Sequence, residues 1–333
     1  MAIGSHIIPR FYLEQFATPS NRERKYWRVW VYERGKEPHH RATSSQGYEN
    51  GYFGFVRRDG SLDESLESKL AKLEDDCNDV VVAAKSDLFD WSSTAYRNKL
   101  AFYAALLFAR ATQRRNLTNR NWKTMQDTFA EMIKEDDYVK RLAARYGAMF
   151  NQVVEPERIR AELTRLSQEM QTPAATKNSF VEDIIDHAEI GKEILLRKPW
   201  QVWKSSTAEF ITSDNPMVTF VPITKDVWHP GYGLTYPGVV VLFPLAPEVC
   251  LTMGISGAYV ISVDAERVNK VNQTVTSVCD RFVYSRTRSE EIKSLVDTYA
   301  GTIKYGVNAL MPVGLRMPSL REFIREKLGI RGS

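Results

Sequence analysis

The spacing of apolar side chains divides the chain into three stretches with different expected secondary structure. From residue 61 to about residue 198, leucine, valine and alanine return at three- and four-residue steps, which is typical of amphipathic helices. On either side, short branched or aromatic runs are separated by turn residues, which predicts strands. The expected strands cover residues 26–32, 201–203, 209–212, 217–221, 239–243, 249–253, 258–262 and 281–284.

Further helices are indicated by residues that favour helix ends. Pro9 suits the first turn of a short helix near the amino terminus, and Asp264 and Ser289 can cap helices that follow the last strands. After a loop between Pro312 and Pro318, apolar residues at helical spacing predict a final helix that contains Leu320, Phe323, Ile324 and Leu328. The order of strands, helices, then strands and helices predicts an α+β fold.

The expected architecture is a central helical bundle, about 61–198, packed against a mixed or antiparallel sheet. The amino- and carboxyl-terminal parts would form that sheet together. We expect residues 1–333 to form a single domain, with a subdivision into 61–198 and 1–60 plus 199–333 as the alternative.

Composition favours a globular protein of the cytosol. Of 333 residues, 43% are hydrophobic and 26% charged, and the longest apolar runs, such as 239–243, are far shorter than the roughly 18 residues of a membrane span. The first residues lack the pattern of a signal peptide. The three cysteines are Cys77, Cys250 and Cys279, and their odd number and wide spacing favour reduced thiols. We expect no membrane contact, and the oligomeric state stays open.

Charge is unevenly distributed although the net charge is only +4. Residues 61–90 are mostly acidic, whereas residues 91–126 contain seven basic residues and no acid. Such a pair of segments predicts two antiparallel helices joined by ion pairs. The basic segment can also present a surface for phosphates, so RNA is the candidate partner.

Motifs for nucleotide cofactors and for catalytic zinc are missing. The sequence has no Walker A pattern, no G-x-G-x-x-G, no H-E-x-x-H and no paired C-x-x-C. We therefore expect no cofactor. Mg²⁺ remains an option through carboxylate oxygens, for which Glu67, Glu74 and Asp214 are the candidates.

The amino-terminal segment HIIPRFYLEQF, residues 6–16, contains the first candidate site. His6 can act as general acid or base, and Arg10 has a planar donor fork suited to phosphate. Tyr12 is a candidate for substrate contact. The alternative is that these side chains only attach the amino terminus to the body of the protein.

The second candidate is the polar turn of Ser213, Asp214 and Asn215, which follows an expected strand. Asp214 could orient His6 or hold a metal ion, or the segment could be a turn and nothing more. The third candidate is Arg110 with Gln113 and Arg114, which share a face if they lie on one helix.

Glu67 and Glu74 likewise share a face of the preceding helix. Carboxylates and arginines on paired helices either line a pocket or neutralise one another, and ion pairing is the simpler interpretation.

Several of these segments together resemble a known family. They are His6-x-x-Pro9-Arg10-Phe11-Tyr12-Leu13-x-x-Phe16, Glu67 through Glu74, the Arg110 helix, Phe210-Ile211-Thr212-Ser213-Asp214-Asn215-Pro216 and Phe243-Pro244-Leu245-Ala246-Pro247. In order and spacing the chain is similar, from residue 6 to about 285, to the bacterial family catalogued as domain of unknown function 4238. Ala246 stands where that family has a serine. The resemblance implies one domain in which these motifs lie together, and no assigned reaction.

The leading hypothesis is a cytosolic phosphodiesterase-type hydrolase, in the first instance a nuclease acting on RNA. In it, His6 is the acid or base, Asp214 orients His6, and Arg10, Arg110 and Arg114 hold phosphate. Tyr12, Gln113, Ser213 and Asn215 would contact substrate. A role as a toxin or in phage defence is an analogy only. The alternatives are a non-catalytic binding or regulatory protein that uses the basic helix, and an enzyme acting on a small phosphorylated or nucleotide ligand.

Overall fold

The fold is α+β, as the sequence predicts. The computed structural model describes residues 4–20, 26–57, 59–86, 89–224 and 227–305. The last helix expected from the sequence, which would contain Leu320 and Leu328, lies outside these residues. None of the helices within the described ranges is long and apolar enough to cross a membrane.

Short strands occupy both ends of the described chain. They are β1 (Gly4–His6), β2 (Thr18–Ser20), β3 (Tyr26–Glu33), β4 (His39–Ala42), β5 (Tyr48–Asn50), β6 (Phe55–Val56), β7 (Leu62–Asp63), β8 (Trp200–Lys204), β9 (Thr212–Ser213), β10 (Val218–Pro222), β11 (Trp228–Pro230), β12 (Val240–Ala246), β13 (Val249–Met253), β14 (Val260–Ser262) and β15 (Phe282–Ser285). Each strand expected from the sequence is present, although the one expected at 209–212 is reduced to the two residues of β9.

Helices fill the middle of the chain and follow β14 and β15. They are α1 (Arg10–Glu14), α2 (Ser65–Ala83), α3 (Thr94–Arg110), α4 (Thr112–Lys134), α5 (Asp136–Phe150), α6 (Pro156–Met170), α7 (Pro173–Val181), α8 (Ile184–Leu196), α9 (Ala265–Ser277) and α10 (Glu290–Tyr299), with a 3₁₀ turn at Thr43–Ser45. The expected caps are formed, since Asp264 accepts the amide of Arg267 and Ser289 accepts the amides of Glu291 and Ile292.

Two larger sheets organise the body of the protein. The first has the order β11-β10-β12-β13-β8-β14 and is antiparallel except for the parallel pair of β14 and β8. The second has the order β2-β3-β15-β9, with β4 also paired to β3, and is antiparallel throughout. This second sheet contains strands from both ends of the described chain, which confirms the expected shared sheet.

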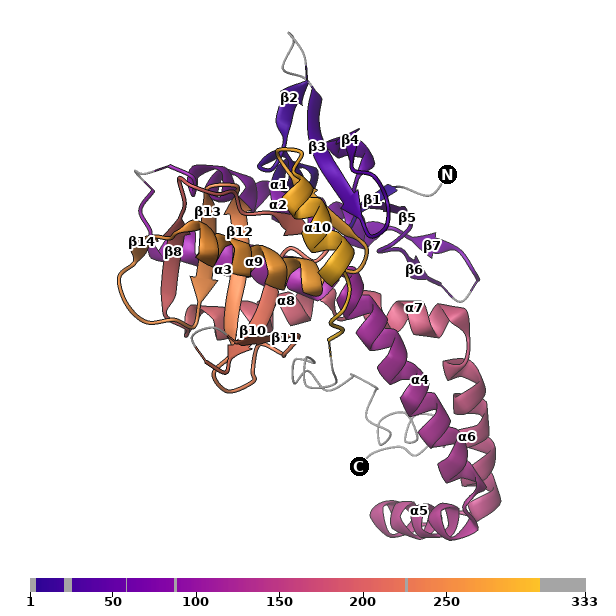
Figure 1. Cartoon of the computed structure of the whole chain (residues 1–333). Helices are drawn as coiled ribbons and strands as arrows, with labels where there is room; N and C mark the ends of the chain where they lie inside the picture. The colour runs from indigo at the N-terminus through magenta and orange to yellow at the C-terminus, as the bar shows by residue number, and fades with distance from the viewer. Residues whose placement is uncertain (1–3, 21–25, 58, 87–88, 225–226, 306–333) are drawn as a thin grey trace.

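The helical region separates into two parts rather than one bundle. In Figure 1, α2, α3 and α8 lie within the body beside the sheets, whereas α4, α5 and α6 extend away from it as an arm. Residues 100–110 of α3 are all buried, as befits a helix enclosed on every side. The arm has its own apolar cluster, which includes Phe129, Val139 and Leu163.

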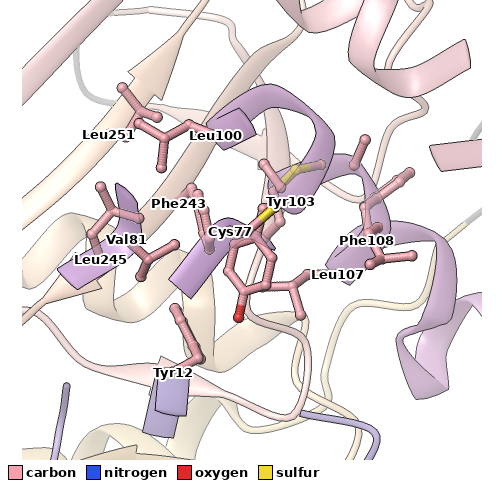
Figure 2. Close-up of a cluster of buried hydrophobic side chains, with 14 of the residues drawn as sticks. Tyr12, Cys77, Val81, Leu100, Tyr103, Leu107, Phe108, Phe243, Leu245 and Leu251 are labelled. Carbon is pink, nitrogen blue, oxygen red and sulfur yellow. The ribbon is translucent and has the colours of Figure 1, made fainter. Parts of the chain in front are cut away.

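The amino-terminal segment is part of the core. Ile8, Tyr12, Leu13 and Phe16 are 0% exposed. Figure 2 shows Tyr12 among side chains of α2, α3, β12 and β13, and its ring stacks on that of Phe243 with 5.7 Å between the centroids. Burial of one such side chain is worth roughly 1.5–3 kcal/mol. These contacts fix the residues around them, and the segment is not a frayed end.

Candidate functional site

A hollow of about 410 Å³ lies where β1, α1 and α2 meet, and we call it the N-terminal hollow. It is lined by His6, Arg10, Phe11, Glu14, Glu67, Ala71 and Glu74. Two of the sequence expectations meet here. His6 and Arg10 of the amino-terminal motif line the hollow together with Glu67 and Glu74, which are expected to share one face of a helix.

His6 is placed at the hollow by the close packing of β1 against β5 and the turn that precedes β5. β1 pairs antiparallel with β5, so that His6 lies opposite Tyr48, and the two rings meet edge to face at 5.5 Å. The amides of Ile7 and Ile8 both donate to the carbonyl of Gly47. Gly47 has a φ of +60°, and a Cβ there would lie 3.1 Å from Cβ of Ile8. A glycine is therefore required at this turn.

Two atoms that can transfer protons are buried in this site without a partner. They are Nε2 of His6 and Oε2 of Glu67, and neither has a hydrogen bond. Burial raises the pKa of Glu67, against the lowering effects of the Ser5 hydroxyl and of Arg110. Buried polar atoms in native proteins nearly always have a partner, so unpaired ones indicate a functional site or an unseen ligand.

A pH prediction follows from the raised pKa of Glu67. The stability that this group contributes is complete below the ordinary pKa of a glutamate and is lost as the pH rises through its pKa in the folded protein. Glu67→Gln removes this titration. Denaturant melts from acid to neutral pH should therefore show the variant gaining stability over the wild type as the pH rises. A difference that stays constant over this range would contradict the raised pKa.

One of the lining residues, Glu74, pairs with a buried arginine. Arg110 is 0% exposed and its Nη1 pairs with Oε1 of Glu74. Nε and Nη2 of Arg110, and the buried hydroxyl of Tyr103, have no hydrogen bond. The pair confirms the expected ion pairing between α2 and α3, to which Asp79 and Lys99 add a second contact at 3.4 Å.

Arg10 is the cation that reaches the open side of the hollow. Its side chain is 47% exposed, and Nε donates to Oε1 of Glu14 at 2.7 Å. The terminal nitrogens of Arg10 make no hydrogen bond with the described residues and can bind an anion that enters.

Asp214 does not orient His6, which corrects the sequence hypothesis. Its carboxylate accepts the backbone amides of Asp280, Arg281 and Phe282 at 2.7, 2.6 and 2.8 Å. Burial raises the pKa of Asp214 to about 6, although these amide bonds act in the opposite direction. The carboxylate therefore clamps the polar turn to the start of β15.

The side chains on either side of Asp214, those of Ser213 and Asn215, are also hydrogen-bonded to the backbone. Ser213 Oγ donates to the carbonyl of Asn215 and accepts its amide, and Nδ2 of Asn215 donates to the carbonyl of Val278. Ser213 and Asn215 are 0% exposed. The side chains therefore form the turn that the sequence predicts, and neither Ser213 nor Asn215, expected to contact substrate, lines the N-terminal hollow.

The expected face of Arg110, Gln113 and Arg114 is also wrong, because the helix is interrupted. α3 ends at Arg110, and Ala111 has an extended conformation with ψ 148° before α4 begins. Gln113 donates to the carbonyl of Cys279 at 3.2 Å. Burial lowers the pKa of Arg114 to about 10, and its guanidinium lies over the ring of Phe108. Neither residue lines the N-terminal hollow.

Tyr12 is likewise structural. Its hydroxyl shares a hydrogen bond of 2.9 Å with Oγ1 of Thr212 and donates to the carbonyl of Pro244 at 2.6 Å. Burial raises its pKa. The hydroxyl links α1 to β9 and β12, and Tyr12, expected to contact substrate, does not line the N-terminal hollow.

The carboxylates considered for Mg²⁺ do not converge. Glu67 and Glu74 line the hollow, while Asp214 is clamped by amides elsewhere. In the described ranges no group of three or more histidine, cysteine, aspartate or glutamate side chains could hold a metal ion.

Sequence reasoning missed Glu14, Phe11 and Ala71 as lining residues. The signal for Glu14 was its position four residues after Arg10, which on a helix predicts the observed ion pair.

The comparisons with known proteins agree with the resemblance found in the sequence. A family model described as a protein of unknown function, DUF4238, matches residues 5–289. No match was found among the curated proteins or among the solved structures. The matched range includes every residue that lines the N-terminal hollow.

Proposed function

Since the chain belongs to the DUF4238 family of proteins of unknown function, we propose from the chemistry of the N-terminal hollow that it is a phosphodiester hydrolase and, more specifically, a nuclease acting on RNA. One observation carries the proposal. Nε2 of His6 and Oε2 of Glu67 are buried in one site without partners, and Arg10 borders that site. A base, an acid and a cation are the groups that phosphodiester cleavage needs.

In the proposed reaction, Nε2 of His6 takes the proton of the ribose 2′-hydroxyl. The 2′-oxygen then forms a bond to phosphorus while the bond from phosphorus to the 5′-oxygen breaks. Glu67, whose pKa burial raises, would donate its proton to the leaving 5′-oxygen. This step gives a 2′,3′-cyclic phosphate and a free 5′-hydroxyl. In a second step Glu67 takes a proton from water, the water oxygen bonds to phosphorus, and His6 returns its proton to the departing 2′-oxygen, which leaves a 3′-phosphate.

Arg10 would hold the phosphate oxygens and offset their developing negative charge. Arg110 has a different part in this proposal from the one expected from the sequence. Its charge is balanced by Glu74, so that it shapes the wall instead of binding phosphate. No metal is required by this scheme, and Mg²⁺ remains an additive to be tested.

The direct test is cleavage of end-labelled total RNA, single-stranded DNA and duplex DNA, with EDTA and with Mg²⁺. We expect RNA to be cut in EDTA, and His6→Ala and Glu67→Gln each to lower the rate by about 10²- to 10⁴-fold. The melting temperature of His6→Ala should stay within about 2 °C of the wild type.

His229→Ala is the matched control, since His229 lies exposed on β11, outside the hollow. Its rate should equal that of the wild type. Absence of cleavage in both conditions, or a stability loss without an activity loss in His6→Ala, would contradict the proposal. The second result would support a non-catalytic binding protein instead.

The size of the hollow supports a second candidate, an enzyme acting on a small phosphorylated or nucleotide ligand. A volume of about 410 Å³ falls within the roughly 300–1,000 Å³ typical of small-ligand pockets. Hydrolysis of a dinucleotide but not of longer RNA would favour this candidate. We further propose that the protein acts in the cytosol, where its three free, buried cysteines would stay reduced. A role as toxin or phage-defence effector stays an analogy.

A further inference from the structure

A second hollow, of about 570 Å³, lies between the loop that follows β5 and the helices α4 and α7. We call it the arm-side hollow. Its polar lining consists mainly of four amides and two cations, which are Asn50, Asn116, Asn119, Gln171, Arg115 and Lys177. None of these residues belongs to the N-terminal hollow.

Lys177 supplies the uncompensated charge of this hollow. Arg115 is neutralised by Glu49, with which it forms two hydrogen bonds of 2.7 and 3.2 Å, and its guanidinium covers the ring of Tyr52 at 4.2 Å. Nζ of Lys177 donates to the carbonyl of Gly51 at 2.7 Å and has no carboxylate within ion-pair distance among the residues described. A half-buried ammonium with two donors to spare is suited to an anionic group.

The amides supply recognition of a different kind. The side chain of Asn119 makes no hydrogen bond within the part of the chain that the structure describes, and the side chain of Gln171 makes only a long one there, at 3.4 Å, to Oγ of Ser167. An amide offers both a donor and an acceptor, which matches the edges of nucleobases. Phosphate and base recognition are thus combined in one hollow.

The two hollows share the β1–β5 ribbon as a wall. His6 of β1 lines one, while Glu49 and Asn50 of β5 line the other, and Glu49 lies opposite Ser5 in the pairing. Paired strands lie about 4.8 Å apart, so little more than one ribbon separates the linings. The hydroxyl of Tyr52 also donates to the carbonyl of Arg110, whose guanidinium pairs with Glu74 of the N-terminal hollow.

We propose that the arm-side hollow binds a neighbouring nucleotide of a single-stranded RNA whose scissile phosphate lies in the N-terminal hollow. Lys177 contacts the phosphate of that nucleotide, and Asn119 and Gln171 contact its base. The proposal rests on the function proposed above and specifies its substrate as a single strand rather than a free nucleotide.

Binding, measured apart from cleavage, tests the proposal. The probe is a fluorescein-labelled single-stranded RNA of about eight nucleotides, titrated at about 0.1 M salt into the full chain carrying His6→Ala. Adding Lys177→Ala should weaken binding by about fivefold and reduce the slope of log K against log salt by about 0.7. Adding Lys140→Ala should change neither, since Lys140 is an exposed lysine of α5 in the distal arm.

Asn119→Asp provides a variant that breaks no hydrogen bond and places a negative charge in the same hollow. It should weaken binding at least as much as Lys177→Ala while the melting temperature is kept. Equal affinities for Lys177→Ala, Asn119→Asp and Lys140→Ala would overturn the proposal. So would equal affinities of the wild-type hollow for the RNA and for adenosine monophosphate.

The two proposals fail in distinguishable ways. RNA binding that depends on Lys177, with no cleavage by the wild type, would support the arm-side hollow and remove the hydrolase. Cleavage of RNA at the same rate by wild type and Lys177→Ala, with unchanged affinity, would keep the hydrolase and overturn the arm-side hollow.

Discussion

Replacing Asp214 with asparagine is expected to lower the free energy of unfolding by about 4 kcal/mol. The carboxylate accepts three backbone amides, of which Oδ1 takes that of Asp280 and Oδ2 takes those of Arg281 and Phe282. Asparagine has one acceptor oxygen, so its amide nitrogen must face a backbone N–H. A buried donor then meets a donor, and the charge that strengthened the remaining bonds is gone. Urea denaturation at neutral pH measures the loss.

Asp264→Asn is the matched control for this experiment. Asp264 caps α9 by accepting a single amide, that of Arg267, at 2.9 Å. Asparagine serves as an N-cap about as well as aspartate, so this exchange should cost a few tenths of a kcal/mol. Similar losses in the two variants would mean that the clamp at Asp214 contributes little to stability. A loss of RNA cleavage in a folded Asp214→Asn protein would return this residue to the catalytic role expected from the sequence.

The example of Asp214 shows where sequence reasoning stops. Ser213, Asp214 and Asn215 are turn-forming residues, and local chemistry was enough to predict the turn. The amides that hold the carboxylate come from residues 280–282, more than sixty positions later. The residues of the turn give no indication of these distant amides. The pairing of β9 with β15 brings the amides to the carboxylate.

A break between α3 and α4 is the reason why Arg110, Gln113 and Arg114 do not share one helix face. The sequence from residue 94 to residue 134 contains no proline or glycine, and its residues favour a continuous helix. The chain nevertheless turns at Ala111, whose carbonyl accepts the amides of Arg114 and Arg115 and starts α4. The hydroxyl of Tyr52, distant in sequence, bonds the freed carbonyl of Arg110. Tertiary contacts thus outweigh local propensity at this position.

Predictions from helical spacing are correct where all the residues concerned lie on one helix. Glu67 and Glu74 were expected on one face of a helix, and both line the N-terminal hollow from α2. Attachment of the amino-terminal motif to the body of the protein is one of the two alternatives that the sequence leaves open, and the motif is indeed buried. The meeting of His6 with these glutamates was not, because it depends on the pairing of β1 with β5. The sequence therefore predicts the helix face of the site, but not the strand pairing that brings His6 to it.

The second large effect is expected at the ion pair that closes the N-terminal hollow. Glu74→Ala should lower the free energy of unfolding by about 3–5 kcal/mol, since it leaves the charge of the fully buried Arg110 without a counterion. Asp76→Ala is the control, because Asp76 is an exposed acid on the same helix, and it should stay within about 0.5 kcal/mol of the wild type. Thermal or urea melts of both variants measure the difference.

The double variant Glu74→Leu with Arg110→Met distinguishes the contribution of the ion pair to protein stability from a role of the pair in RNA cleavage. Apolar side chains of similar volume often replace a buried ion pair without loss, so the double variant should recover most of what Glu74→Ala loses. If it is stable and still cleaves RNA, the pair only shapes the wall, as proposed. If it is stable but inactive, Arg110 or Glu74 acts on the substrate. If the double variant is as unstable as Glu74→Ala, packing around Arg110 matters more than its charge, and the expected cause of the first loss is wrong.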